Sequence, residues 1–323
     1  MAGPLDGLVT HKFVQTNGIK MHYVEAGSGP TVLLLHGFPD FWYSWRHQIP
    51  AFVAAGYHVI APDHRGVGET EIPDSVDKYS ELHHVGDIIG LLDALGLKQV
   101  LVVAHDWGAT YGSDLALFRP DRVKALVLLG LPYIPRVQEV FAVDILRKMM
   151  GNDMYISVFQ TPGVAEEIFK KAKNEDIFSA FYLRWNSTPN LAIPPFIENE
   201  TLPDWLSKED LKIYAAAFDK TGWTGALNHY RAMKLSWELK APWTKAPLPA
   251  EVPVMLMMGS QDLGAALFGI KTEADEDPFF AKSRLAMPGL KAHSIIDASH
   301  FLHQENYKEV NQLVLDFLKN YKC

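Results

Sequence analysis

One aspartate of the sequence lies where the chain predicts a sharp turn between a strand and a helix. The run Gln99–Ala104 is short, branched and apolar, and a helix pattern directly follows Asp106. The small residues Ala104 and Gly108 flank Asp106, as a strained turn requires where strand and helix approach closely. This arrangement predicts a nucleophile elbow, whose usual form is Gly-x-Ser-x-Gly, with Asp in place of Ser and Ala in place of the first Gly. The alternative is that Asp106 caps the following helix.

A carboxylate nucleophile restricts the chemistry that this turn can perform. Attack of Asp106 on an ester or amide carbonyl would give an anhydride, a poor intermediate for a hydrolytic reaction. Attack on a saturated carbon gives an ordinary ester, which water can then cleave. The residue type therefore indicates displacement at an sp³ carbon, as in an epoxide or an alkyl halide.

A general base and its acidic partner are expected after the last two predicted strands. His300 follows the run Ala292–Asp297, at the end of a strand where the sites of open α/β sheets gather. Asp262 follows the preceding run and would orient the imidazole and stabilise its charged form. Asp297 is the alternative, but we favour Asp262 because a loop after a neighbouring strand can reach the ring.

Two backbone groups are candidates for an oxyanion hole. The segment His36–Pro39 follows another buried run, and Trp107 follows the aspartate. The N–H groups of Phe38 and Trp107 would together hold the charge that develops on the Asp106 carbonyl during ester hydrolysis. The alternative for the first segment is a turn without a catalytic role.

The elements that must position these residues are strands alternating with helices. Leucine, isoleucine and valine recur at helical spacing between Leu82 and Leu95, with Ser80 as a candidate N-cap and Gly96 as a candidate C′ glycine. This alternation predicts a doubly wound α/β sheet. The predicted strands of this part are Ile19–Glu25, Thr31–Leu35, Tyr57–Ala61, Gln99–Ala104 and Lys124–Leu129.

The alternation stops at Pro132–Pro135, after which the chain is helical and aromatic to about Trp237. Apolar runs return at Val254–Met258 and Ala292–Asp297. We expect a core over 1–131 and 243–323, interrupted by a helical cap over 132–242. Two consecutive domains are the alternative, but they would leave the last two strands without a sheet to join.

The composition excludes several classes of protein. The chain has 323 residues, 30 basic against 38 acidic, and a formal net charge of −8. Nucleic acids and anionic membranes require clustered Lys and Arg, which the sequence lacks, so we expect neither partner. Cys323 is the only cysteine and no His-Glu-x-x-His occurs, so we expect no metal and no cofactor. No export signal and no apolar run of ~18 residues is present, which predicts a cytoplasmic protein. We expect a monomer or homodimer, although no motif selects between them.

Taken together, these residues resemble the α/β-hydrolase superfamily, and most closely the soluble epoxide hydrolases of plant type. The resemblance covers nearly the whole chain. It implies an α/β-hydrolase fold with a mostly parallel sheet, helices on both faces and an inserted cap. It also implies cofactor-free conversion of a small hydrophobic epoxide to a vicinal diol through an aspartyl ester. The segments that carry it are His36–Pro39, Trp42–Arg46, His105–Gly108, Asp153–Ser157 and Gly225–Arg231.

The resemblance assigns further residues to the site. Tyr155 and Tyr230 match the two tyrosines of the family's cap, and a phenol can protonate the alkoxide that forms as an epoxide opens. His105 and Asp40 match positions that contact substrate or the hydrolytic water, although a glutamate is frequent where Asp40 stands. His229 also departs from the family, many members of which carry a tyrosine there.

Two other functions remain as alternatives. A haloalkane or haloacid dehalogenase also uses an elbow aspartate, but it would need halide-binding donors in place of the tyrosine pair. A hydrolase-fold receptor for a small hydrophobic ligand tends to keep a serine at the elbow, where this chain has Asp106.

Overall fold

An eight-stranded sheet lies at the centre of the protein, in the order β1-β2-β4-β3-β5-β6-β7-β8. The structure is a computed structural model that describes residues 5, 7–184, 192–268 and 278–322. β2 pairs antiparallel with β1 and β4, and all other neighbours pair in parallel. The mostly parallel sheet predicted from the sequence is therefore confirmed. The strands are β1 (Thr10–Thr16), β2 (Ile19–Gly27), β3 (Thr31–Leu35), β4 (His58–Pro62), β5 (Val100–His105), β6 (Val123–Leu129), β7 (Val254–Gly259) and β8 (Leu290–Ile296).

Every predicted strand occurs, with ends shifted by no more than two residues. β1 has no predicted counterpart, because its side chains are mostly exposed and it carries no apolar run. In the central strands both faces are buried, since successive side chains point to opposite sides. On β3, Leu33 and Leu35 belong to one hydrophobic cluster, while Val32 and Leu34 belong to another. The continuous apolar runs therefore reflect burial on both faces.

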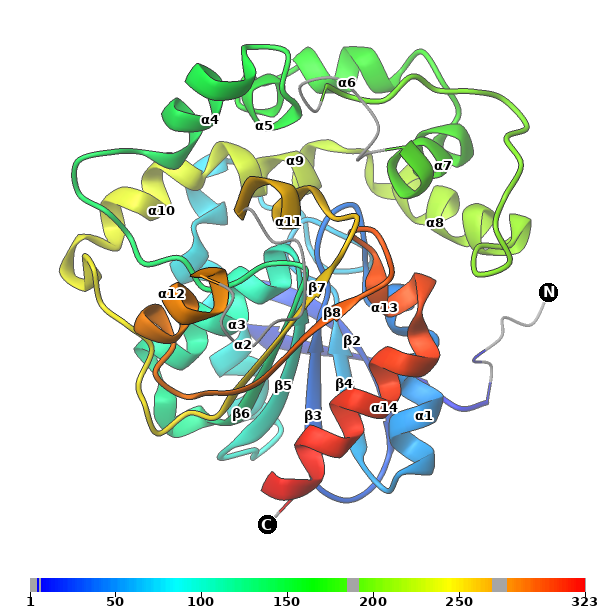
Figure 1. Cartoon of the computed structure of the whole chain (residues 1–323). Helices are drawn as coiled ribbons and strands as arrows, with labels where there is room; N and C mark the ends of the chain where they lie inside the picture. Colours follow the sequence, from blue (N-terminus) through cyan, green and yellow to red (C-terminus); the bar gives the residue numbers. More distant parts are fainter. Residues whose placement is uncertain (1–4, 6, 185–191, 269–277, 323) are drawn as a thin grey trace.

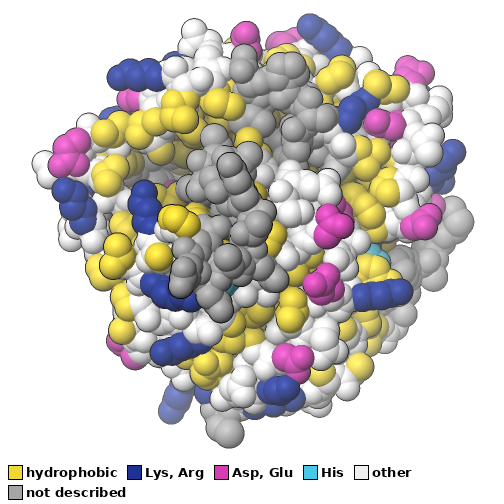
Figure 2. Space-filling model, in the orientation of Figure 1, with side chains coloured by type: hydrophobic (Ala, Val, Ile, Leu, Met, Phe, Trp, Pro, Cys, Tyr) yellow, Lys and Arg dark blue, Asp and Glu magenta, His cyan; other side chains and the backbone are white. Residues whose placement is uncertain are grey.

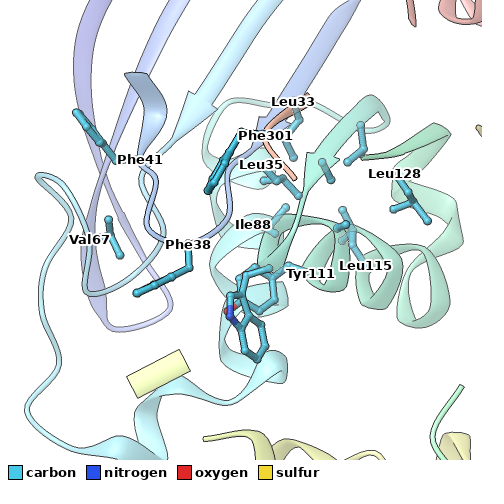
Figure 3. Close-up of a cluster of buried hydrophobic side chains, with 14 of the residues drawn as sticks. Leu33, Leu35, Phe38, Phe41, Val67, Ile88, Tyr111, Leu115, Leu128 and Phe301 are labelled. Atoms are coloured by element: carbon cyan, nitrogen blue, oxygen red, sulfur yellow. The ribbon is translucent and has the colours of Figure 1, made fainter. Parts of the chain in front are cut away.

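Helices cover each face of the sheet (Figure 1). One face packs against α2 (Glu81–Ala94) and α3 (Trp107–Phe118), and Figure 3 shows Ile88 and Leu115 from these helices beside Leu33, Leu35 and Leu128. The opposite face packs against α1 (Gln48–Ala54) and α14 (Tyr307–Leu318). The remaining helices of this part are α11 (Leu263–Phe268), α12 (Pro278–Ala286) and α13 (Leu302–Glu305), with short 3-10 turns at Trp42–Trp45, Val76–Tyr79, Pro120–Arg122 and Lys319–Tyr321.

The predicted helix between Leu82 and Leu95 is α2, but its two ends differ from expectation. Gly96 has φ +67 and stands just after the C-cap, as predicted. Ser80 stands at the N-cap, yet its side chain caps no N–H of the helix. Its hydroxyl instead lies 2.7 Å from Nδ1 of His83. The capping role expected of Ser80 was therefore wrong.

A second layer of helices lies between β6 and β7 in the chain and across one end of the sheet (Figure 1). The chain returns to the same sheet at β7, which pairs with β6. On this layer, hydrophobic atoms gather over the region of α4, where Ile145 and Met149 are exposed (Figure 2). None of the helices in the described ranges has the length and hydropathy to cross a bilayer. The layer comprises α4 (Ala142–Met150), α5 (Tyr155–Phe159), α6 (Val164–Phe169), α7 (Asn174–Arg184), α8 (Lys208–Thr221), α9 (Thr224–Arg231), α10 (Met233–Leu239) and a 3-10 turn at Ala241–Trp243.

Candidate active site

Asp106 occupies a strained turn between β5 and α3. Its φ of 52 and ψ of −119 lie outside the regions that a side chain normally allows. Such strain persists only where the surroundings demand it, and here two glycines make room. A Cβ on Gly108 would lie 2.1 Å from the Leu35 carbonyl oxygen, and one on Gly37 would lie 2.4 Å from Cβ of Asp106. The Asp106 side chain makes no capping bond to α3, so the helix-cap alternative does not hold.

The carboxylate of Asp106 meets a histidine and a second carboxylate. Nε2 of His300 lies 3.5 Å from Oδ2 of Asp106, and Nδ1 of His300 lies 2.9 Å from Oδ2 of Asp262. Asp262 and His300 follow β7 and β8, which are parallel neighbours, so both loops leave the sheet at the same edge. Asp297 is exposed and accepts a hydrogen bond from Nε2 of Gln261 at 3.1 Å instead. Of the two candidate acids, the structure thus brings Asp262 to the ring.

Asp106 and His300 shift each other's pKa, and Asp262 contributes to the shift of His300. Burial alone would raise the pKa of Asp106, but the hydrogen bond and charge of His300 lower it to about 2. Burial likewise lowers the pKa of His300, but the charges and hydrogen bonds of Asp262 and Asp106 outweigh this and raise that pKa well above its usual range. The site therefore holds an ionised Asp106 against an imidazolium between two carboxylates.

The predicted oxyanion donors stand on either side of the turn. The Phe38 N–H donates to Oδ1 of Asp106 at 2.8 Å. His36 holds the Phe38 loop, because its Nδ1–H donates to the Gly37 carbonyl at 2.9 Å and its Nε2 accepts from the His64 N–H at 3.0 Å. Trp107 is the first residue of α3, where backbone N–H groups have no partner within the helix. Figure 3 shows the Phe38 ring among the buried hydrophobic side chains of the cluster on this face of the sheet.

The two cap tyrosines lie next to each other above the turn. Tyr155 begins α5 and Tyr230 lies in α9, with their ring centroids 6.0 Å apart. Burial, followed by the negative charge of Asp106, raises the pKa of Tyr155. Burial chiefly raises the pKa of Tyr230 as well. Both phenols therefore keep their protons at neutral pH and can donate them.

A cavity of about 380 Å³ lies between the turn and helices α4 and α5, within the usual range of ~300–1,000 Å³ for small-molecule sites. Tyr155 lines it beside Asp106, and Tyr230 packs edge-on against both Tyr155 and Trp107, with ring centroids 6.0 and 5.1 Å away. The polar side chains that line the cavity are those of the triad and Tyr155. The apolar lining was not predicted, because a leucine or methionine on a cap helix has the same sequence signal as one in the core. Those lining side chains are Phe38, Leu131, Ile134, Ala142, Ile145, Leu146, Met149, Met154, Ile156 and Leu263.

Asp40 and His105 lie beside the triad but do not line the cavity. Oδ1 of Asp40 accepts a hydrogen bond from the Tyr182 hydroxyl at 2.6 Å. Nε2 of His105 lies 2.9 Å from the His300 carbonyl oxygen, to which it must donate. Tyr182 and the buried His303 of α13 complete this group, and the sequence offered no signal for either. Of the described His, Cys, Asp and Glu side chains, one group has ligand atoms within 4.8 Å of one another: Asp40, His105 and His303.

His229 also faces away from the cavity. Its Nδ1 lies 2.7 Å from the Tyr111 hydroxyl, and its Nε2 lies 3.1 Å from the Arg65 carbonyl. Burial lowers the pKa of His229 to about 3, so the ring is neutral and ties α9 to the core. Arg65 belongs to the loop 63–66, and its guanidinium pairs with the carboxylate of the buried Asp87 at 2.5 Å. This ion pair indicates a structural role for the loop.

Comparisons with known proteins agree with this geometry. A family profile described as alpha/beta hydrolase fold matches residues 30–307. Epoxide hydrolase 3 of Siraitia grosvenorii is 44% identical over 322 residues, covering 97% of this chain and 99% of that protein. Epoxide hydrolase A of Mycobacterium tuberculosis is 35% identical over 328 residues, covering 97% and 98%.

Solved structures give the same result. The crystal structure of an epoxide hydrolase from Vigna radiata has a TM-score of 0.88 and 43% identity, covering 97% of this chain and 99% of that one. Epoxide hydrolase I of potato, Solanum tuberosum, has a TM-score of 0.87 and 38% identity, covering 97% and 100%. These findings confirm the resemblance inferred from the motifs. The chain belongs to the epoxide hydrolase family of the α/β-hydrolase fold.

Proposed function

We propose that the protein hydrolyses an epoxide to a vicinal diol through a covalent ester on Asp106. One observation carries the proposal: a buried, ionised carboxylate on a strained turn faces an imidazole that a second carboxylate holds, at the polar end of an apolar cavity. Family relatives that carry the name epoxide hydrolase support the same reaction.

In the first half-reaction, the phenols of Tyr155 and Tyr230 donate hydrogen bonds to the epoxide oxygen. An oxygen of Asp106 attacks a ring carbon, and the bond between that carbon and the epoxide oxygen breaks. The electron pair passes to the oxygen, which takes a proton from a tyrosine. The product is a hydroxyalkyl ester of Asp106. This step needs no general base, because the carboxylate is already ionised.

Before the second half-reaction, the His300 imidazolium gives up its proton and the tyrosinate left by the first step regains one. Neutral His300 then accepts a proton from water while the water oxygen attacks the ester carbonyl carbon of Asp106. Asp262 stabilises the imidazolium that forms. The N–H groups of Phe38 and Trp107 hold the oxyanion, and one such donor typically contributes ~2.7–4 kcal/mol. The bond between the carbonyl carbon and the product oxygen breaks, and the product oxygen takes the second proton of the water. Asp106 is released as a carboxylate carrying the water oxygen, and His300 is left as the imidazolium of the resting enzyme.

Isotope labelling tests this route directly. A single turnover in H₂¹⁸O should place the label in Asp106 and leave it out of the diol, since the first diol oxygen comes from the enzyme. Asp106→Ala should abolish turnover, and His300→Gln should accumulate the ester as a mass increase on the intact protein. Label in the diol after a single turnover, or no adduct in His300→Gln with bound substrate, would contradict the covalent route.

Replacing the tyrosines tests the proton donors separately. Tyr155→Phe and Tyr230→Phe should each slow ester formation, and loss of both should slow it by the ~10²–10⁴-fold typical of general acid catalysis. Rapid quenching and mass analysis of the ester measure this step. If the double variant forms ester at the wild-type rate, the phenols are not the proton donors.

The substrate and the setting of the enzyme are proposals of the same kind. The apolar cavity favours a small hydrophobic epoxide. Diol formation from a panel of fatty-acid, terpenoid and aryl epoxides would identify the substrate. Halide release from haloalkanes in the same panel would test the dehalogenase alternative. We propose residues 132–242 as the cap over this cavity. A cytoplasmic monomer or homodimer that needs no cofactor agrees with the single cysteine and the charge pattern; cell fractionation and light scattering would check it.

A further inference from the structure

A buried polar group lies behind the triad, on the side away from the cavity. His303 in α13 is fully buried, and neither of its ring nitrogens has a hydrogen-bond partner. Oδ2 of Asp40 and Nδ1 of His105 are buried and unpartnered too. These three side chains offer ligand atoms within 4.8 Å of one another. Buried polar atoms without partners are rare in folded proteins, and each one calls for a binding partner.

The donors and acceptors of this group can be assigned from their neighbours. Nε2 of His105 faces the His300 carbonyl, which can only accept, so Nε2 carries a proton and, in the tautomer with one ring proton, Nδ1 presents a lone pair. Oδ2 of Asp40 is also an acceptor. Burial lowers the pKa of His303 well below its usual range, so this ring is neutral and offers one N–H donor. A single water molecule can donate to both acceptors and accept from the one donor, so it matches the hydrogen-bonding groups of these three side chains.

The distances favour water over a metal ion. Oδ2 of Asp40 and Nδ1 of His105 lie 3.7 Å apart, which is too far for a direct hydrogen bond. Ligand bonds of ~2.1 Å would bring two ligands of a tetrahedral zinc ion to about 3.4 Å from each other. One water at about 2.8 Å from each atom accommodates the wider spacing without movement. Buried waters typically make ~3 such bonds.

We propose that a water molecule bound by Asp40, His105 and His303 holds the His105 ring in place, and that His303 is thereby a positioning residue for the general base. His105 donates from its other nitrogen to the backbone carbonyl of His300, so a fixed His105 ring holds the backbone from which the His300 side chain projects. The rings of His303 and His105 lie 4.3 Å apart between centroids, which places the water within reach of both. This inference rests on the proposed function, because it assumes that His300 activates water.

The proposal predicts a selective kinetic effect. Ester formation uses Asp106 and the tyrosines, whereas ester hydrolysis also needs His300. Loss of the water site should therefore slow only the second half-reaction, and ester should accumulate during turnover. The expected loss is about tenfold, since groups that orient a catalytic residue through hydrogen bonds typically contribute ~10–100-fold.

Three substitutions of His303 test this prediction. His303→Leu removes every polar atom, whereas His303→Asn and His303→Gln each restore an N–H near one of the two ring nitrogens. We expect slow ester hydrolysis in His303→Leu, an unchanged rate of ester formation, and recovery in at least one amide variant. His84→Leu is the matched control, because His84 is equally buried with both nitrogens unpartnered but stacks on Tyr111 instead.

The outcomes separate this inference from the proposed function. If wild-type enzyme and His300→Gln never form an ester, the covalent route itself fails. If they do, but His303→Leu slows both half-reactions equally or neither, His303 does not position the base. A high-resolution crystal structure of the wild-type enzyme gives a check that needs no variant: a water within hydrogen-bond distance of the three atoms supports the proposal, and its absence overturns it. Inactivation of wild-type enzyme by a chelator, reversed by Zn²⁺, would assign the site to a cation instead.

Discussion

The charge of Asp106 should control the protonation of His300, and its neutralisation is the perturbation that exposes this coupling. Oδ2 of Asp106 lies 3.5 Å from Nε2 of His300, and both side chains are largely buried. With an effective dielectric constant of ~20, the attraction between the two charges is about 5 kcal/mol, whereas full solvent screening would leave about 1 kcal/mol. Asp262 remains hydrogen-bonded to Nδ1 in either case, so only part of the support for the imidazolium is removed.

The sign of the effect follows from the reaction. Two carboxylates raise the pKa of His300 in the resting enzyme. Formation of the ester removes the charge of Asp106, so the pKa of His300 falls and the ring can become a base when water must be activated. The rate of ester hydrolysis should therefore rise with pH through this lowered pKa. Ester formation should show no such dependence between pH 5 and 9, because the pKa of Asp106 is about 2.

Asp106→Asn is an uncharged mimic of the ester and allows an equilibrium measurement. We expect NMR titration of the histidine ring carbons to give a lower pKa for His300 in this variant than in wild type, with His300→Gln identifying the signal. Single-turnover kinetics across the same pH range would follow each half-reaction. An unchanged or higher pKa for His300 in Asp106→Asn, or ester hydrolysis that slows as pH rises, would refute the coupling.

Three further predictions concern the acid, the turn and the histidines. Asp262→Asn should slow ester hydrolysis by up to ~10⁴-fold, as removal of a triad carboxylate does, while Asp297→Asn should stay near wild type in the same stopped assay; equal losses would contradict the assignment. Gly108→Ala should abolish activity, since its Cβ would meet the Leu35 carbonyl oxygen at 2.1 Å, and an active, folded variant would show that the turn can relax. Burial lowers the folded-state pKa of several histidines, so the unfolded chain binds more protons below about pH 6.5 and the free energy of unfolding should fall as pH falls. The loss is at most ~1.4 kcal/mol per pH unit for each histidine, and thermal melting measures it; constant stability down to pH 5 would exclude this effect. The histidines are His36, His47, His64, His84, His229 and His303.

The strands and the reactive turn could be predicted because their signals are local. A strand buried on both faces must be apolar throughout, and the runs at Thr31–Leu35 and Val254–Met258 end within one residue of the observed strands. Asp106 could be found for the same reason, since its small neighbours Ala104 and Gly108 are adjacent in the chain. β1 escaped prediction because an exposed edge strand needs no apolar pattern.

The choice between Asp262 and Asp297 illustrates what a linear pattern leaves open. Asp297 follows β8 three residues before His300, whereas Asp262 follows β7, and only the parallel pairing of β7 with β8 brings Asp262 to Nδ1. Ser80 shows the same limit on a smaller scale. Its position at a helix start favoured a cap, but the nearby His83 ring takes the hydroxyl instead.

The sequence by itself predicted seven of the eight strands, the turn that carries Asp106 and the class of chemistry, because each of these signals lies in residues that are neighbours in the chain. Tertiary structure decided the rest. The cavity lining, the edge-on packing of Tyr230 against Trp107 and the contact between Asp40 and Tyr182 all join segments far apart in the sequence. The buried group around His303 is of this kind, since a histidine pattern in one helix says nothing about which carboxylate from another loop will face it. Local residue types select the reaction, whereas the packing of cap against core determines which side chains position and enclose it.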